Sequence, residues 1–151
     1  SVLFFLGILL AVSSLATAGH LTQVATALRE SLGHIYAINY AIGLLSAVVD
    51  NVPLVAGAMK MYPLVSEKML AATAAEELGW MSQFVVDGNF WEMLAYCAGT
   101  GGSCLIIGSA AGVAAMGMEK INFIWYLKKI SGLAFIGYLA GAVTYMLMFA
   151  A

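Results

Sequence analysis

Long apolar stretches separated by short polar segments make up most of the chain. Residues 2–19 and 130–151 are almost uninterrupted apolar runs. A helix of about 20 residues crosses a hydrocarbon core of ~30 Å, so each run predicts a transmembrane span. Residues 21–32 instead place apolar side chains at helical spacing along one face, namely Leu21, Val24, Leu28 and Leu32. This pattern predicts a helix that lies in the membrane interface.

The apolar stretch over residues 34–62 is interrupted in its middle. Residues 35–49 are too few for a comfortable span, and they end at Asp50 and Asn51, which are favourable residues at helix N-termini. Pro53 suits the first turn of a following helix, because it has no amide hydrogen to donate. Two short helices that meet at a polar turn predict a re-entrant hairpin over residues 34–62, with its tip near the middle of the membrane.

A second interrupted apolar stretch covers residues 91–118. Its glycines are Gly99, Gly101, Gly102, Gly108, Gly112 and Gly117. Glycine at this density weakens a continuous helix, and unwound backbone inside a membrane is tolerated only where it lines a protein cavity. We therefore expect a span that is broken in mid-membrane, around residues 108–112. A closely packed helix face would use the same small residues, so that alternative stays open at this point.

Polar segments lie on both sides of the broken span. Residues 63–90 contain several acidic side chains and predict an extramembrane connection, partly helical over residues 66–78. Residues 119–129 combine Trp125 and Tyr126 with lysines, which is typical of an interfacial helix. If residues 91–118 cross the membrane once, the basic residues divide equally between the two sides, so charge alone does not orient the chain.

Composition agrees with this reading of a single membrane domain over residues 1–151. The chain is 63% hydrophobic and only 9% charged, which predicts an all-α integral membrane protein with about three transmembrane helices. The formal net charge is -2 and no long basic run is present, so nucleic acid is not an expected partner. Because the chain opens with Ser1 directly on an apolar run, we expect a fragment with an upstream portion missing. A signal peptide is the alternative for residues 2–18, although no basic segment precedes it.

Asp50 gives the strongest functional signal. No other charged residue lies between Glu30 and Lys60, and an intramembrane carboxylate usually marks an ion path, a proton relay or a buried pair. Asn51 and Ser46 offer oxygen atoms close to the same tip, and oxygen ligands are what sodium or lithium requires. The alternatives are that Asp50 only caps a helix and that Ser46 only packs helices together.

The remaining polar residues carry weaker signals. Thr100 and Ser103 either line a pathway or bond to preceding carbonyl groups. Cys97 and Cys104 form no CxxC pair and lie near no histidine, so they predict small core residues. Ser103 is followed by Cys104 rather than glycine, and no HExxH sequence occurs. A membrane protease is therefore not expected, and no resident cofactor is expected either.

Together these elements resemble a known family. The segments at residues 46–55 (SAVVDNVPLV), 97–103 (CAGTGGS) and 107–112 (IGSAAG) are similar to the C-terminal half of NhaD-type sodium/proton antiporters of the ion transporter superfamily. Residues 116–120 and 125–129 extend the likeness, which covers residues 28–144.

The resemblance implies that the chain is the second of two inverted repeats, each with a re-entrant hairpin followed by a broken helix. It implies sodium (or lithium)/proton antiport, a homodimer of the full-length protein, and a bacterial plasma membrane with the hairpin on the periplasmic side. The first repeat, with its half of the ion site, is absent. A sodium-coupled anion or carboxylate transporter of the same superfamily, or a non-transporting fragment or subunit, remains the alternative.

The resemblance also implies roles for individual residues. Asn51 would take the hairpin-tip asparagine position and Ser46 would be a hydroxyl ligand. Asp50 would alternate between a cation and a proton. Backbone carbonyl groups at the break would complete the cation site, from Gly108, Ser109 and Ala110.

Overall fold

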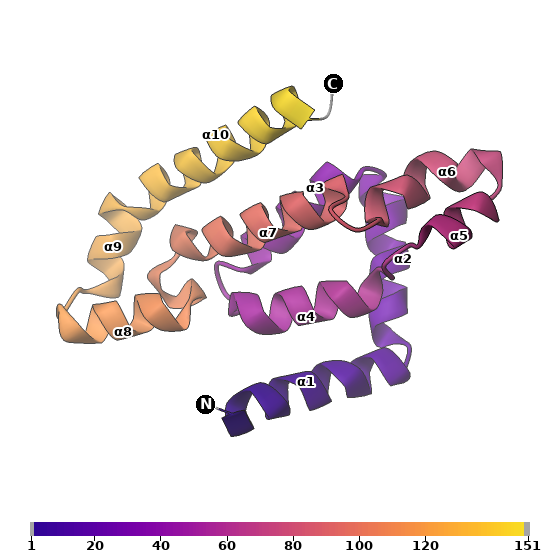
Figure 1. The fold of residues 1–151 in the computed structure, drawn as a ribbon. Helices are drawn as coiled ribbons and strands as arrows, with labels where there is room; N and C mark the ends of the chain where they lie inside the picture. The colour runs from indigo at the N-terminus through magenta and orange to yellow at the C-terminus, as the bar shows by residue number, and fades with distance from the viewer. Residues whose placement is uncertain (1, 150–151) are drawn as a thin grey trace.

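A computed structural model describes residues 2–149, and its regular structure in that part of the chain is helical (Figure 1). The α-helices are α1 (Val2–Thr17), α2 (His20–Leu32), α3 (Ile35–Leu45), α4 (Asn51–Met61), α5 (Glu67–Ala71), α6 (Ala75–Met81), α7 (Asn89–Gly101), α8 (Ala110–Met118), α9 (Phe123–Lys129) and α10 (Ser131–Phe149). Short 3-10 turns are η1 (Ser82–Phe84), η2 (Gly102–Cys104) and η3 (Ile106–Gly108). The last two residues of the expected span 130–151 lie outside the described part.

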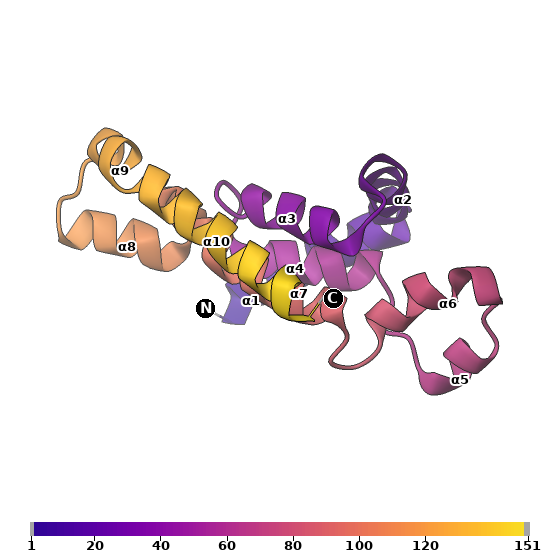
Figure 2. The same cartoon turned by 90° about the horizontal axis from the view of Figure 1, so that it is seen from above.

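The helix α2 runs across the direction of its neighbours. Figures 1 and 2 show α1, α3, α4 and α7 extending along one direction, with α2 crossing them at one end. The bend between α1 and α2 is 72°, and it occurs at Gly19, whose φ of 79° falls in a region that glycine adopts readily. An orientation across the other helices is the one expected of an interfacial helix. Its depth in a membrane stays a prediction.

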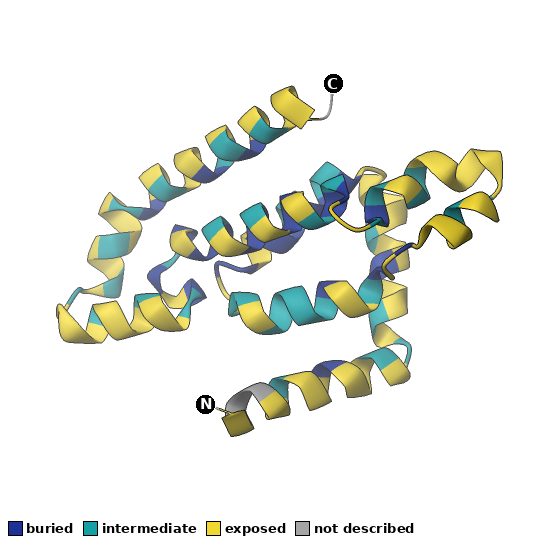
Figure 3. Cartoon of the chain, viewed as in Figure 1, coloured by how far each residue is buried: buried dark blue, intermediate teal, exposed yellow. Residues whose placement is uncertain are grey.

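One helix in the described residues is long and apolar enough to cross a membrane by itself. That helix is α10, with 19 residues, and Leu133, Ile136 and Leu147 on it are exposed (Figure 3). Exposed aliphatic side chains along a whole helix suit a hydrocarbon environment. Within the expected span over residues 2–19, the helix α1 ends at Thr17 after 16 residues, and the chain turns at Gly19. That α1 crosses the membrane stays a prediction. The total of about three spans stays a prediction.

The interrupted stretch over residues 34–62 forms a helical hairpin. That the hairpin is re-entrant, with its tip near the middle of the membrane, stays a prediction. The first arm is α3, the second is α4, and five residues outside α-helix, 46–50, join them. Figures 1 and 2 show the chain reversing its direction at this turn. Asp50 occupies the N-cap position of α4, and Pro53 lies in the first turn of that helix. Both positions agree with the local signals in the sequence.

The second interrupted stretch is a broken helix, but the break lies earlier than predicted. The chain leaves α-helix after Gly101, passes through η2 and η3, and resumes as α8 at Ala110. Ser109 causes the early restart, because its hydroxyl oxygen accepts the Gly112 amide at 3.0 Å and caps α8. Residues 102–109, rather than 108–112, are therefore the unwound segment.

The polar connections lie at opposite ends of the molecule. Figure 1 shows α5 and α6 projecting beyond one end and α9 lying at the other. The expected helical part of residues 63–90 is present but extends through η1 to Phe84. Phe84 stacks on Tyr62 with ring centroids 5.3 Å apart and contacts Phe90 at 4.7 Å. This aromatic cluster ties the connection to the base of the hairpin.

Candidate functional site

The helices α3 and α7 pack closely and run in the same direction. Asn39 of α3 donates from Nδ2 to the Phe90 carbonyl at 3.0 Å, and seven residues later Ser46 donates from Oγ to the Ala98 carbonyl at 2.9 Å. Both side chains are fully buried. Since later residues of α3 meet later residues of α7, the C-terminal ends of both helices arrive at the same place. The hairpin turn and the break therefore lie together.

Glycine makes this close approach possible. A β-carbon added to Gly101 would collide with the carbonyl group of Gly43, so neither helix has room for a larger side chain there. The Tyr138 hydroxyl of α10 reaches the same crossing, where it donates to the Tyr40 carbonyl at 2.9 Å. Three helices are thus fixed against one another immediately before two of them unwind.

Gly108 lies in close contact with the hairpin tip. A β-carbon on Gly108 would lie 2.7 Å from the carbonyl oxygens of both Ser46 and Ala47 and 2.5 Å from that of Gly102. Contacts this short are not available to a real side chain, so the backbone of the break passes directly over the carbonyl groups of the tip. The structure thereby brings together two of the segments that the sequence singled out.

Several carbonyl groups at this contact are outside the helical hydrogen-bond pattern. Within residues 2–149, the carbonyl groups of Ser46, Ala47 and Gly108 accept none of the backbone hydrogen bonds that are made outside regular helices. Buried carbonyl groups normally have a partner. Unwound backbone carbonyls of discontinuous membrane helices are ligands for sodium. These three oxygens therefore lack a backbone hydrogen-bond donor outside regular helices in the described part of the chain. Their role as cation ligands stays a prediction.

Asp50 and Asn51 lie at the start of α4, both half-buried. Asp50 occupies the N-cap position, yet its side chain makes no capping hydrogen bond. The alternative in which Asp50 only caps the helix therefore has no hydrogen bond to support it. In the described residues the ion pair found is between Arg29 and Glu77, so Asp50 has no basic partner there.

The expected ligands at the break are not equivalent in the structure. Gly108 is buried against the hairpin, as described above. The Ser109 carbonyl instead accepts the Val113 amide at 3.0 Å in the first turn of α8. Ala110 is exposed as the first residue of that helix. The geometry thus places Gly108, and not the other two, against the hairpin tip. The role of all three as cation ligands stays a prediction.

The weaker candidates lie close to the break. Thr100 is half-buried and donates from Oγ1 to the Tyr96 carbonyl at 2.7 Å, the local bond weighed as its alternative role. Ser103 is exposed, and its carbonyl oxygen accepts the Tyr126 hydroxyl at 2.9 Å. Cys97 and Cys104 are buried and unpaired by disulfide, which confirms that they are core residues. Among the described residues, no group of histidine, cysteine and acidic side chains is arranged to hold a metal ion.

Sequence reasoning missed some residues that shape the site. The Ala47 carbonyl was not singled out, because any residue type has one. The sequence predicts Tyr126 only as part of an interfacial helix, and nothing in its neighbourhood predicts the hydrogen bond to the Ser103 carbonyl. The small residue Gly43 was the available signal for the close crossing, since its partner Gly101 lies in the glycine-rich stretch.

An apolar helical chain in which a hairpin tip meets the break of another helix is typical of secondary transporters with discontinuous helices. Comparison with known proteins supports this class. The chain is 51% identical over 144 residues to sodium/proton antiporter 1 of Arabidopsis thaliana. The matched region covers 95% of the chain and 22% of that protein. It is 49% identical to sodium/proton antiporter 2 of the same plant, covering 95% of the chain and 30% of the relative.

Bacterial proteins are similar to the chain as well. The Na(+)/H(+) antiporter NhaD of Vibrio cholerae is 35% identical over 150 residues, which covers 98% of the chain and 27% of that protein. No protein-family model and no solved structure matches the chain. The resemblance to NhaD-type antiporters is confirmed, and these relatives are named as transporters rather than enzymes. The chain spans less than a third of the length of each of these three proteins.

Proposed function

We propose that the chain forms one part of a sodium (or lithium)/proton antiporter, and that its hairpin tip and broken helix supply half of the cation site. The observation that carries the proposal is the contact of Gly108 with the carbonyl groups of Ser46 and Ala47, in the same hairpin turn as the uncapped Asp50. The names of the similar plant and bacterial proteins support the same activity.

The exchange follows from the electrostatics of Asp50. An ionised carboxylate at membrane depth is strongly unfavourable unless a cation or a proton neutralises it. Sodium and a proton would satisfy the same carboxylate, so the occupancy of one excludes the other. We expect the site to change the side of the membrane to which it opens only when a sodium ion or a proton neutralises the carboxylate. Sodium therefore moves one way and protons move the other.

Oxygen atoms around Asp50 would complete the coordination. Asn51 offers its amide oxygen, and Ser46 keeps hydroxyl lone pairs free while it donates to Ala98. The carbonyl groups of Ala47 and Gly108 add backbone ligands. Such a set of hard oxygen atoms suits sodium or lithium and needs no further cofactor.

The other half of the site would come from the part of the transporter that this chain does not span. An inverted first repeat with its own hairpin is the proposed partner, together with a second copy of the full-length protein and the surrounding lipid. The relatives support a membrane location. A bacterial plasma membrane stays a prediction, because both plant and bacterial proteins are similar over nearly the whole chain.

The test uses the full-length transporter in sealed vesicles with a fluorescent indicator of internal pH. Asp50→Asn removes the exchangeable charge while keeping the size of the side chain, so sodium-induced proton movement should fall to the background of empty vesicles. Asp87→Asn is the matched control, since Asp87 is exposed and has a φ of 56°, which asparagine also tolerates. Its activity should match the unmodified protein.

Two outcomes would contradict the proposal. Normal sodium-induced proton movement in Asp50→Asn, with the protein correctly inserted, would remove Asp50 from the exchange. Sodium entry that requires a carboxylate substrate and moves no counter-proton would instead identify a sodium-coupled carboxylate carrier.

A further inference from the structure

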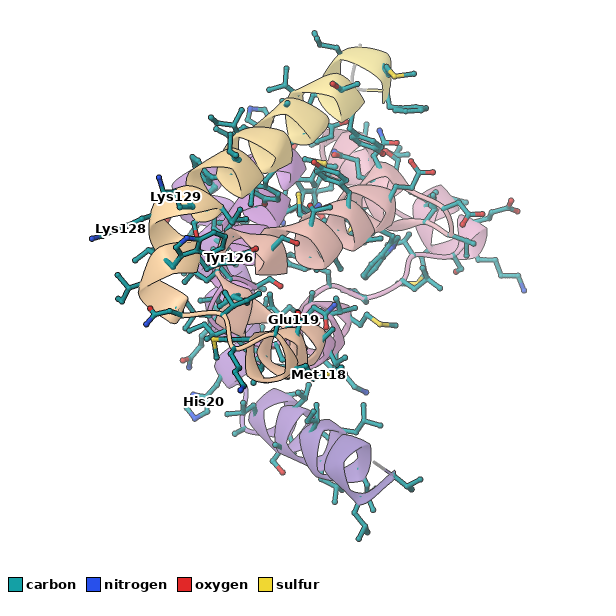
Figure 4. The ribbon with its side chains drawn as sticks, turned by 90° about the vertical axis from the view of Figure 1, so that its left-hand side faces the viewer. His20, Met118, Glu119, Tyr126, Lys128 and Lys129 are labelled. Carbon is teal, nitrogen blue, oxygen red and sulfur yellow. The ribbon has the colours of Figure 1, made fainter. Side chains whose placement is uncertain are left out.

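The short helix α9 is attached directly to the break. Tyr126 donates from its hydroxyl to the Ser103 carbonyl at 2.9 Å, and Ser103 lies in η2. The residue before Ser103 is Gly102, whose carbonyl oxygen lies against Gly108 at the proposed cation site. In Figure 4 the Tyr126 ring turns toward the body of the molecule. A displacement of α9 would therefore reach the break through one hydrogen bond.

The opposite side of α9 carries positive charge. Lys128 and Lys129 occupy the last turn of the helix, are exposed, and project away from the bundle in Figure 4. Neither forms an ion pair within residues 2–149. The acidic residue nearest in sequence is Glu119, the C-cap residue that follows α8. The two lysines thus have no carboxylate to neutralise them.

Apolar side chains accompany these lysines on the same helix. Ile124 and Trp125 are each 52% exposed, and Leu127 is 43% exposed. The next residues begin α10, the helix that is long enough to cross a membrane. Exposed aromatic and aliphatic groups beside lysines, immediately before a span, match the boundary between headgroups and hydrocarbon. Phosphate is the anion that this boundary contains, and basic residues there attract anionic lipids.

We infer that α9 binds the phosphate groups of anionic lipids through Lys128 and Lys129, and that Tyr126 transmits this contact to the break. This inference rests on the proposed function, because the quantity that lipid would adjust is the sodium affinity of the site. Bound lipid fixes the position of α9, and Tyr126 of α9 fixes the Ser103 carbonyl in η2. This keeps Gly102 and Gly108 in contact with each other and with the hairpin tip. Tyr126 is a positioning residue that does not touch the cation.

The experiment compares the full-length transporter in phosphatidylcholine vesicles with and without phosphatidylglycerol. The half-saturating sodium concentration and the maximal rate are measured in both. Phosphatidylglycerol should lower the half-saturating concentration by about two- to tenfold, the range that one hydrogen bond accounts for, with little change in maximal rate. A second readout is the rise in Tm when phosphatidylglycerol is added to the detergent-solubilised protein.

Two variants separate lipid binding from coupling. Lys128→Gln with Lys129→Gln should lose both the rise in Tm and the sodium response. Tyr126→Phe keeps the lysines, so it should keep the rise in Tm but lose the sodium response. Lys68→Gln, an exposed lysine in α5 at the other end of the molecule, is the matched control and should respond as the unmodified protein does. All of them experience the same vesicle surface charge, so differences between them report specific binding.

The outcomes that overturn the inference are definite. If the double lysine variant responds to phosphatidylglycerol like the unmodified protein, α9 is not the lipid site. If Tyr126→Phe keeps the full sodium response, lipid is not coupled through Tyr126. If no variant exchanges sodium for protons in any vesicle, the proposed function fails, while the Tm readout still decides whether α9 binds the lipid.

Discussion

The carbonyl oxygen of Ser46 lies 2.7 Å from the position that a β-carbon on Gly108 would occupy. The hairpin tip and the broken helix therefore meet backbone against backbone, with no side chain between them. In the proposed site, backbone carbonyl groups of both segments would contact the cation, as unwound backbone does in transporters with discontinuous helices. The backbone contact also makes the site sensitive to the addition of a single methyl group.

Gly108→Ala should separate the tip from the break. The new methyl group meets backbone carbonyls that cannot rotate away, so we expect overpacking of about 1–3 kcal/mol and displacement of the ligands. The half-saturating sodium concentration should rise at least about tenfold, which corresponds to about 1.4 kcal/mol. Gly117→Ala is the control, because no atom lies within 4 Å of its added β-carbon. Equal sodium dependence in the two variants would show that the contact does not shape the site.

Gly101→Ala tests the crossing of α3 and α7 rather than the ion site. Its β-carbon would collide with the Gly43 carbonyl, and both helices are held by the buried bonds from Asn39 and Ser46. We expect the Tm of the purified protein to fall, with destabilisation of about 1–3 kcal/mol. Gly99→Ala in the same helix has open space around its β-carbon and should leave the Tm unchanged or slightly higher. Similar Tm values for both variants would contradict the close crossing.

The sequence predicted the hairpin accurately because its signals are local. Asp50 and Pro53 mark a helix start through their own backbone chemistry, and the apolar run before them is too short to span. The break was placed too late because glycine density reports where a helix is weak, whereas the restart depends on one capping hydroxyl, that of Ser109. The contact of Gly108 with Ser46 joins residues far apart in the chain, and no local pattern specifies such a pairing.

Asn51→Ala tests a side-chain ligand at the tip. Asn51 is the first residue of α4 and half-buried, so its removal should leave the helix and the overall stability nearly unchanged. Loss of one ligand oxygen should raise the half-saturating sodium concentration by about 10- to 150-fold, which corresponds to a lost charge-assisted contact of about 1.5–3 kcal/mol. Transport assays over a range of sodium concentrations, with Tm as the stability check, measure both effects. Unchanged sodium dependence would mean that the amide does not contact the cation.

Ser46→Ala decides between the two roles that the sequence left open for this residue. The hydroxyl donates to the buried Ala98 carbonyl at 2.9 Å, so its loss should destabilise the protein by about 1–3 kcal/mol whatever else it does. If Ser46 is also a ligand, the half-saturating sodium concentration should rise together with the fall in Tm. Asn39→Ala is the matched comparison, because it removes the other buried bond between α3 and α7, seven residues away from the tip. We expect the Tm to fall in both variants and the sodium affinity to fall only in Ser46→Ala. If the sodium affinity of Ser46→Ala equals that of Asn39→Ala, Ser46 is a packing residue alone.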